Sequence, residues 1–403
     1  MEQNKKVPSI RFKGFEDECV FKVLDSIAYF YKGKEHSWKD IDEKGIYKVI
    51  LYGNLYTNYG MIISDVILKT NYISEKTFFG KKNDVLIPSS DTTPIGIARA
   101  SSLEIDNVIL GGDINIIRPI GIDGNYLSLN LNSNKNKLIS LIKGSTVRHI
   151  DNSDLKKIDL YISDSIIEQT KIGNFFKTID DQINAQEQKH QKLVNLKKAM
   201  LEKMFPKEGA DVPEIRFKGF TEKWKEKKLG DFGNVAMNKR IFKSETSIIG
   251  EIPFYKIGTF GSIPDSYITR EKFLEYKSKY HYPQKGDVLI SASGSIGRLV
   301  VYQGKEEYFQ DSNIVWLNHG GKLNNKFLKQ FYLIVKWNGL EGSTIKRLYN
   351  SNILSTNISV PRVEEQQKIG EYFEKLDNLI EQSQEQIKKI KNIKQALLQK
   401  MFV

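Results

Sequence analysis

The chain has 403 residues, 40% hydrophobic and 27% charged, a composition typical of a soluble globular protein with more than one core and unlike that of a disordered chain. Lysine and arginine outnumber aspartate and glutamate by 61 to 49, and the formal net charge of +12 favours nucleic acid as a partner, although a lysine-rich genome composition gives the same excess. The single cysteine, Cys19, excludes an internal disulfide and a thiolate zinc site, and no apolar run reaches the roughly 20 residues that span a bilayer. We therefore expect a cytoplasmic protein without a membrane segment.

The chain opens on a motif that recurs in its second half. Residues 7–15 read VPSIRFKGF and residues 212–220 read VPEIRFKGF. Two further segments recur in the same order: GSTVRHIDNSDL from Gly144 is matched by GSTIKRLYNSNIL from Gly342, and EQTKIGNFFKTIDDQI from Glu168 by EQQKIGEYFEKLDNLI from Glu365. Three ordered matches of this length indicate a tandem duplication.

A variable stretch follows each opening. Residues 15–143 and 220–341 diverge from one another and are rich in short β-branched and aromatic runs, such as YKVILYGNLYTNYGMII and DVLISASGSIGRLVVY. Glycine, asparagine, aspartate and proline separate these runs, as they separate strands. The sequence therefore predicts two mixed α/β globular domains.

A long helix is predicted after each variable stretch. Residues 163–205 and 362–403 contain no proline and one glycine each, and their apolar residues alternate at four- and three-residue spacing, which is typical of a coiled-coil seam. A helix of about 38 residues is roughly 57 Å long, more than one small domain can cover, although two separate surface helices remain the alternative. PKEGAD at 206–211, directly after the first helix, is typical of a linker.

Signatures of catalysis are absent from the sequence. The Gly-Lys pairs, such as those at Gly33, Gly80 and Gly321, do not continue with Ser or Thr as a phosphate-binding loop requires. No Pro-Pro pair occurs, so the Asn/Asp-Pro-Pro-aromatic motif of amino-methyltransferases is missing, and the five histidines lack the spacing of a metal site. A non-catalytic protein without cofactor or metal is favoured. A fused restriction enzyme or a nuclease with duplicated DNA-binding domains, and a non-DNA scaffold held by its helices, stay open as alternatives.

The order of these motifs resembles a known family over essentially the whole chain. Tandem VPxIRFKGF openings, each followed by a variable domain and by a helix that ends in LEKMF or LQKMF, are similar to the specificity subunit of Type I restriction-modification systems. The resemblance implies an α+β fold: two target-recognition domains in a pseudo-symmetric tandem repeat, joined by two long helices in an antiparallel coiled coil. The implied segments are a first domain at 1–162, a helix at 163–205, a linker at 206–211, a second domain at 212–361 and a helix at 362–403.

The resemblance also implies partners. Each domain is expected to read one half of a bipartite site in double-stranded DNA. The chain is expected to dock two methyltransferase subunits, which methylate adenine, and through them the restriction and motor subunits that cut unmodified DNA.

Polar loops after apolar strands are the best candidates for contacts with DNA, because base edges and phosphates are bound by Arg, Lys, Asn, Gln, Ser, Thr and Tyr side chains. In the first domain the predicted DNA-binding residues are Tyr52, Asn54, Tyr56, Thr57, Tyr59, Ser89, Ser90, Thr92, Thr93, Arg99 and Arg148. In the second they are Lys256, Thr259, Ser291, Ser293, Ser295, Arg298 and Lys346. Arg148 and Lys346, just beyond each GST, are candidates for phosphate contacts. An ordinary turn or a solvated charge explains any single one of these residues equally well.

Overall fold

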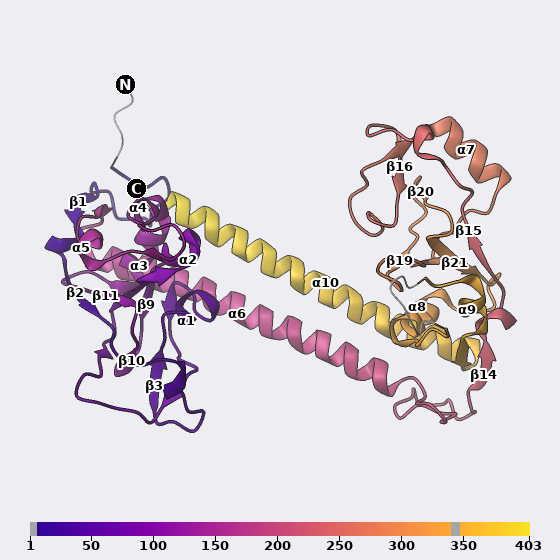
Figure 1. Cartoon of the computed structure of the whole chain (residues 1–403), viewed down its shortest axis with the longest axis horizontal. Coiled ribbons are helices and arrows are strands. Elements are labelled where there is room, and N and C mark those ends of the chain that lie inside the picture. The colour runs from indigo at the N-terminus through magenta and orange to yellow at the C-terminus, as the bar shows by residue number, and fades with distance from the viewer. Residues whose placement is uncertain (1–5, 340–346) are drawn as a thin grey trace. The chain divides into compact units, whose positions relative to one another are not determined.

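The computed structural model describes residues 6–339 and 347–403 and divides into two compact units (Figure 1). Unit 1 comprises Met1–Gln188 and Glu385–Val403, and unit 2 comprises Lys189–Gln384. The division falls inside two long helices, α6 (Ile166–Lys203) and α10 (Val363–Lys400), so each unit contains part of both. The five segments expected from the sequence have their boundaries at the ends of the long helices and not within them. These segment boundaries stay a prediction.

Unit 1 is built from two larger sheets, two two-stranded sheets and several short helices. Its strands are β1 (Val20–Val23), β2 (Ala28–Lys32), β3 (Tyr47–Ile50), β4 (Ile62–Ile63), β5 (Lys69–Thr70), β6 (Phe79–Gly80), β7 (Val85–Pro88), β8 (Ser90–Asp91), β9 (Ser101–Leu103), β10 (Val108–Leu110), β11 (Ile114–Pro119), β12 (Arg148–His149) and β13 (Asp159–Ile162). Its helices besides the long ones are α1 (Asn54–Thr57), α2 (Pro94–Ile97), α3 (Gly124–Ser133), α4 (Lys135–Ser140) and α5 (Asn152–Leu155). The larger sheets have the orders β2-β11-β7-β9-β4 and β5-β3-β10-β6, the two-stranded sheets are β1-β13 and β12-β8, and α3 packs on β7, β9 and β11.

Unit 2 is built in the same way. Its strands are β14 (Lys225–Lys228), β15 (Asn234–Met237), β16 (Ile252–Tyr255), β17 (Tyr267–Ile268), β18 (Val288–Ser291), β19 (Leu299–Val301), β20 (Tyr308–Phe309), β21 (Ile314–Asn318) and β22 (Asn357–Val360). Its shorter helices are α7 (Arg270–Lys279), α8 (Asn325–Ile334) and α9 (Asn350–Ser355). The larger sheets have the orders β15-β21-β18-β19 and β17-β16-β20.

The two units share one topology although the sequences of their strands differ. The order β2-β11-β7-β9 in unit 1 corresponds to β15-β21-β18-β19 in unit 2, and the second sheet of each unit contains a parallel pair, β3 with β10 and β16 with β20. Unit 1 differs in having a further parallel pair, β4 with β9. The central strands β7 and β18 are buried at all four positions. Their continuous apolar runs, VLIP and VLIS, explain this, because a strand covered on both faces needs apolar residues on both.

The recurring openings are held by the same buried ion pair in both units. Arg11 donates from Nε and Nη2 to the Glu168 carboxylate over 2.6 and 2.8 Å, and Arg216 binds Glu365 over 2.7 and 2.8 Å. Both carboxylates are 1% exposed, so each depends on its arginine for a partner. The identity of the motif in the two halves thus has a structural cause.

The recurring Lys-Ile-Gly sequence at 171–173 and 368–370, the KIG motif, ends in a glycine that allows α6 to approach α3 and α10 to approach α8. A Cβ atom at Gly173 would lie 2.9 Å from the Asn125 side chain on α3, and one at Gly370 would lie 2.6 Å from the Lys326 side chain on α8. Both distances are too short for a side chain. The motif therefore sets how closely α6 and α10 pack on their domains.

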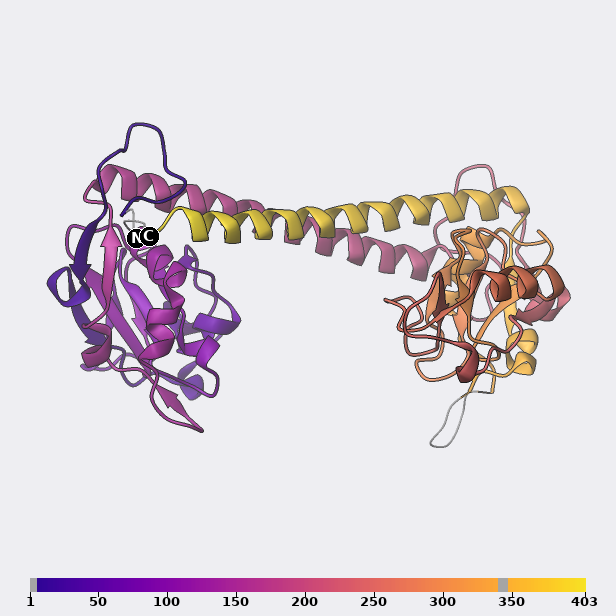
Figure 2. The same ribbon diagram turned by 90° about the horizontal axis from the view of Figure 1, so that it is seen from above.

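Within each unit, the start of one long helix packs against the end of the other (Figure 2). In unit 1, Phe176 of α6 lies 6.3 Å, between ring centroids, from Phe402 just after α10. In unit 2, Phe373 of α10 lies 6.5 Å from Phe205 just after α6. The segments are antiparallel in both units, and the predicted fold class is confirmed. Each core is also completed by the helix end of the other repeat.

Equivalent ion pairs join the helix segments. In unit 1, Lys394 lies 2.5 Å from Asp180, and in unit 2, Lys197 lies 2.5 Å from Asp377. Although burial raises the pKa of Asp377, bonds from Lys197 and Lys329 outweigh it and hold that pKa below its ordinary value. Acidic residues near each helix start therefore meet lysines near the other helix end, which favours antiparallel over parallel pairing. Over residues 6–339 and 347–403, no helix is both long and apolar enough to cross a membrane.

Candidate nucleic-acid interface

Three loops singled out from the sequence meet in unit 1: loop A1 (52–59), loop B1 (89–99) and loop C1 (144–149). Arg148 of loop C1 pairs in strand register with Asp91 of loop B1, and its Nη1 donates to the Thr92 carbonyl oxygen over 2.6 Å. At the end of loop B1, Arg99 Nη1 donates to the carbonyl oxygen of Tyr56 in loop A1 over 3.2 Å. Burial and, to a lesser extent, Asp91 raise the pKa of Tyr56, which agrees with close approach of the loops. Side-chain bonds thus link loop B1 to both loop A1 and loop C1.

Unit 2 brings together the corresponding loops, loop A2 (256–261) and loop B2 (291–298). Arg298 Nη1 of loop B2 donates to the carbonyl oxygen of Phe260 in loop A2 over 2.8 Å. Lys256 forms an ion pair with Asp265 at 2.9 Å, and Ser293 donates to the Asn313 side chain over 2.8 Å. Lys346 lies outside the described residues.

The predicted DNA-binding residues differ in exposure. Thr57, Thr92, Thr93, Ser295 and Arg298 are exposed; Tyr52, Tyr56, Tyr59, Ser90, Arg99, Arg148, Lys256, Thr259 and Ser293 are partly buried; Asn54, Ser89 and Ser291 are buried. The exposed and partly buried residues come from every loop named above. Hydroxyl, phenol and guanidinium groups are therefore at least partly accessible in these loops.

The three buried residues support the loops and do not face solvent in this conformation. Asn54 is 2% exposed, and its side-chain oxygen accepts from the Leu51 N–H over 3.1 Å. Ser291 is 1% exposed, donates to the Ser295 carbonyl over 2.5 Å and accepts from the Arg298 N–H over 2.8 Å. Ser89 is 3% exposed, and its carbonyl accepts from the Ile150 N–H. Short polar side chains that bond their own loop in this way fix a turn.

Sequence reasoning missed three polar residues: Asp91 within loop B1, and Asn313 and Arg347 outside loops A2 and B2. The Asp91 carboxylate accepts from the Thr93 hydroxyl over 2.9 Å, Asn313 accepts from Ser293, and Arg347 Nη2 donates to the Ser312 carbonyl over 3.1 Å. Asp91 and Arg347 are adjacent in sequence to predicted DNA-binding residues. Carboxylates were not among the residue types considered for DNA contacts, yet a carboxylate can accept from the amino group of cytosine.

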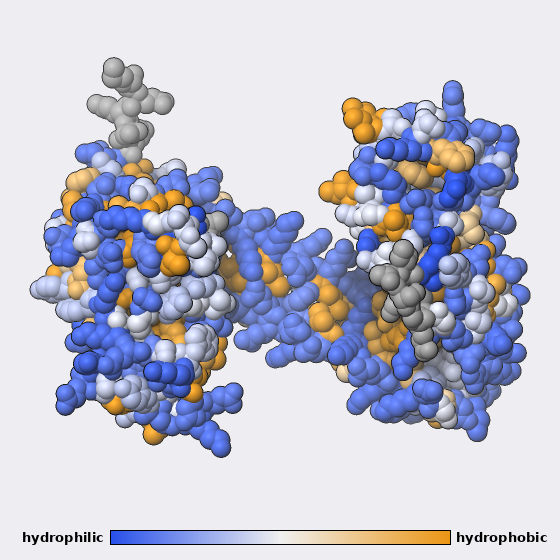
Figure 3. Space-filling view, viewed as in Figure 1, coloured by the Kyte–Doolittle hydropathy of each residue, from blue (hydrophilic) through white to orange (hydrophobic). Residues whose placement is uncertain are grey.

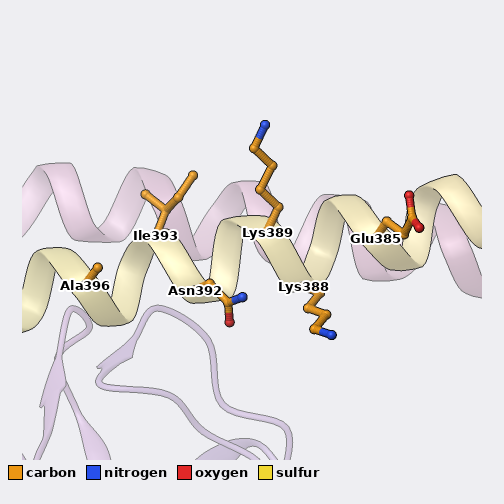
Figure 4. Close-up of a pocket in the computed structure, with 6 residues that line it drawn as sticks. All are labelled: Glu385, Lys388, Lys389, Asn392, Ile393 and Ala396. Atoms are coloured by element: carbon orange, nitrogen blue, oxygen red, sulfur yellow. The ribbon is translucent and has the colours of Figure 1, made fainter. Parts of the chain in front are cut away.

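A second surface with exposed apolar residues lies on the long helices. On α10, Glu385, Lys388, Lys389, Asn392, Ile393 and Ala396 line a shallow hollow (Figure 4). Ile393 is 47% exposed, although much of the protein surface around the helices is hydrophilic (Figure 3). Among the described residues, no group of three or more His, Cys, Asp and Glu side chains could hold a metal ion.

The same face recurs on α6. The residues 197 positions before Lys389, Asn392, Ile393 and Ala396 are Lys192, Asn195, Leu196 and Ala199. Leu196, the counterpart of Ile393, is 39% exposed. A lysine, an asparagine, an exposed branched aliphatic residue and an alanine therefore appear in the same order on both helices.

Known proteins resemble this chain over most of its length. A family model described as the type I restriction modification DNA specificity domain matches residues 16–195 and 221–392. A putative type I restriction enzyme specificity subunit of Haemophilus influenzae is 55% identical over 152 residues, 38% of this chain and 40% of that protein. A type I restriction enzyme specificity subunit of Methanocaldococcus jannaschii is 24% identical over 93% of this chain and 90% of its own length. The crystal structure of a type I restriction-modification S subunit from M. genitalium has the same fold, with a TM-score of 0.67 at 16% identity over 98% of this chain and 99% of that one.

Proposed function

The chain belongs to the type I restriction modification DNA specificity family, and on this premise we propose that it reads a bipartite DNA target, with one half-site read by each unit. It is a targeting subunit and not the catalytic one. The observation that carries the proposal is that two units of one topology present different loop residues between near-identical openings and helices. Two different readers on a repeated framework suit a target whose halves differ.

We assign DNA contacts to the loops of both units. Thr57, Thr92, Thr93 and Ser295 are exposed, and Tyr52, Tyr56, Tyr59, Ser90, Arg148, Lys256, Thr259 and Ser293 of the same set of loops are partly buried. Arg99 and Arg298, which the sequence also suggested as DNA contacts, bond main-chain carbonyls of loops A1 and A2 instead. Hydroxyl and guanidinium groups are suited to base edges and phosphates, and the net charge of +12 attracts the duplex. Lys346 stays a proposed phosphate contact on sequence grounds alone.

Methylation mapping tests the bipartite reading. The methylated adenines of a strain that carries this gene, compared with a strain that lacks it, should define one interrupted motif. Replacing residues 220–341 with the equivalent region of a relative should change one half of that motif and leave the other. Changes in both halves contradict the assignment of one unit to each half-site. Cleavage or methylation of DNA by the chain alone, with magnesium and cofactors added, would instead support an enzyme.

We further propose that two copies of a methyltransferase subunit, which modifies adenine, dock on the repeated helix face, and that restriction and motor subunits join through them. The support is the recurrence of an exposed aliphatic residue, Ile393 and Leu196, among the same neighbours on both helices. Aliphatic side chains at these exposures are suited to the apolar centre of an interface.

Charge substitution tests the docking face. Ile393→Asp and Leu196→Asp should each remove one of two methyltransferase subunits, and the double variant should remove both, as measured by native mass spectrometry. Ile248→Asp is the matched control, because Ile248 is 83% exposed and belongs to neither long helix. Full binding by the double variant contradicts the proposed face.

A further inference from the structure

Arg99 and Arg298 occupy equivalent positions in the two units. Val85, the first residue of β7, lies opposite Ser102 on β9, and Val288, the first residue of β18, lies opposite Val301 on β19. Arg99 lies three residues before Ser102, and Arg298 lies three residues before Val301. Each arginine is the last residue of its loop, B1 or B2, which are together called loop B. The equivalence comes from strand register, because the loop sequences SSDTTPIGIAR and SASGSIGR have diverged.

Each arginine reaches across to loop A of its own unit. Arg99 donates to the main-chain carbonyl of Tyr56 over 3.2 Å and Arg298 to that of Phe260 over 2.8 Å. Because the acceptors are main-chain atoms, the bond does not depend on which side chains loop A1 or A2 (together, loop A) carries. Loop A can therefore change its sequence while the contact persists.

Loop A has a similar turn in both units. The Asn54 side chain accepts from the N–H of the residue three positions before it over 3.1 Å, and the Thr259 hydroxyl does the same over 3.1 Å. These turns fix the internal shape of loop A. They do not fix its position relative to loop B, whereas the arginine bonds the two loops directly in each unit.

We infer that Arg99 and Arg298 are positioning residues, each of which holds loop A and loop B of its unit as a single surface for reading a half-site. The inference rests on the proposed function. Groups that read bases must be held within about half an ångström of their productive geometry. When the loops move apart, every base pair read by that unit is read less well, whereas loss of a direct base contact affects one base pair.

The test uses the full chain assembled with its methyltransferase subunits. Methylated sites are mapped for the natural chain and for Arg99→Ala, Arg99→Lys and Arg298→Ala. Arg99→Ala should relax several base pairs of one half-site, each by about 5- to 150-fold in discrimination, and leave the other half-site strict. Arg298→Ala is the matched control and should relax the opposite half-site. Arg99→Lys should keep most of the discrimination of the natural chain, because a single N–H donor suffices for the bond to the Tyr56 carbonyl.

Each outcome decides between the alternatives. Relaxation at one base pair only, without rescue by lysine, overturns the inference and makes the arginine a direct reader. An unchanged motif, or equal relaxation of both half-sites, in an alanine variant with natural thermal stability overturns it as well. If Arg99→Ala does not fold, a folded Arg99→Lys variant with strict recognition supports the inference, and one with a lost half-site overturns it. Failure of the natural complex to methylate an interrupted motif refutes the proposed function before any variant is made.

Discussion

The last residues of the chain belong to the core of unit 1, so a change there acts on residues far away in sequence. Phe402 is 7% exposed, and its ring centroid lies 5.4 Å from that of Tyr126 and 6.3 Å from that of Phe176. Truncation of a buried Phe to Ala costs about 3–5 kcal/mol, and the chain end can partly relax into the space, so we expect about 3 kcal/mol for Phe402→Ala. For a unit of this size, that lowers Tm by roughly 6–12 °C.

Hydrogen exchange of the full chain locates the effect. In Phe402→Ala, exchange should become faster in α3, β7 and β11 of unit 1, while the sheets of unit 2 stay as protected as before. Phe205→Ala is the matched control, because Phe205 is 5% exposed and lies 5.3 Å from Phe327 in unit 2, where the effect should appear instead. Faster exchange confined to the last turn of α10, or equal changes in both units, would refute the reasoning.

Replacing Arg11 with Ala leaves the buried Glu168 carboxylate unpaired and should cost about 3–5 kcal/mol in urea unfolding. Burial raises the pKa of Glu168, but bonds from Arg11 and Ser163 outweigh it and hold that pKa below its ordinary value. The stabilisation is therefore present at neutral pH and is lost as pH falls through the lowered pKa. An identical dependence of unfolding free energy on acid pH in Arg11→Ala and the natural chain contradicts this. Lys394→Glu should destabilise unit 1 by about 1 kcal/mol, and adding Asp180→Lys should recover most of that loss. A double-mutant cycle that gives no coupling energy between the two positions contradicts this prediction. A permutant that joins residue 403 to residue 1 and opens at 206–211 should keep its DNA specificity, because Ile10 of the first opening bonds Lys400 at the end of α10 in unit 1. A folded permutant without specificity counts against this.

Much of the fold was predictable because its signals are local or repeated. The spacing of apolar residues marked both long helices, and the structure places them at Ile166–Lys203 and Val363–Lys400. The run DVLISASGSIGRLVVY predicted strands, and the buried strand β18 lies within it. Sequence identity between the openings also pointed to a shared role, and the paired arginine and glutamate supply the physical reason.

The candidate interface was predictable only as loops. Nothing in the sequence separates the buried Asn54 and Ser291 from the exposed Thr57 and Ser295, because all are short polar residues in turns. Their exposure depends on which main-chain groups lie within reach once the strands have paired. The bond from Arg99 to loop A1 is of the same kind, since its acceptor is a carbonyl more than forty positions earlier.

The sequence by itself determined the duplication, the two kinds of element and the apolar seam of each helix, because periodicity and repetition are properties of the chain. The tertiary structure alone decided which helix end completes which core. LEKMF and LQKMF are nearly the same, and either is suited to either unit by composition. Phe205 enters unit 2 and Phe402 enters unit 1 because the antiparallel segments bring each helix end to the domain of the other repeat, and such long-range packing leaves no trace in local sequence.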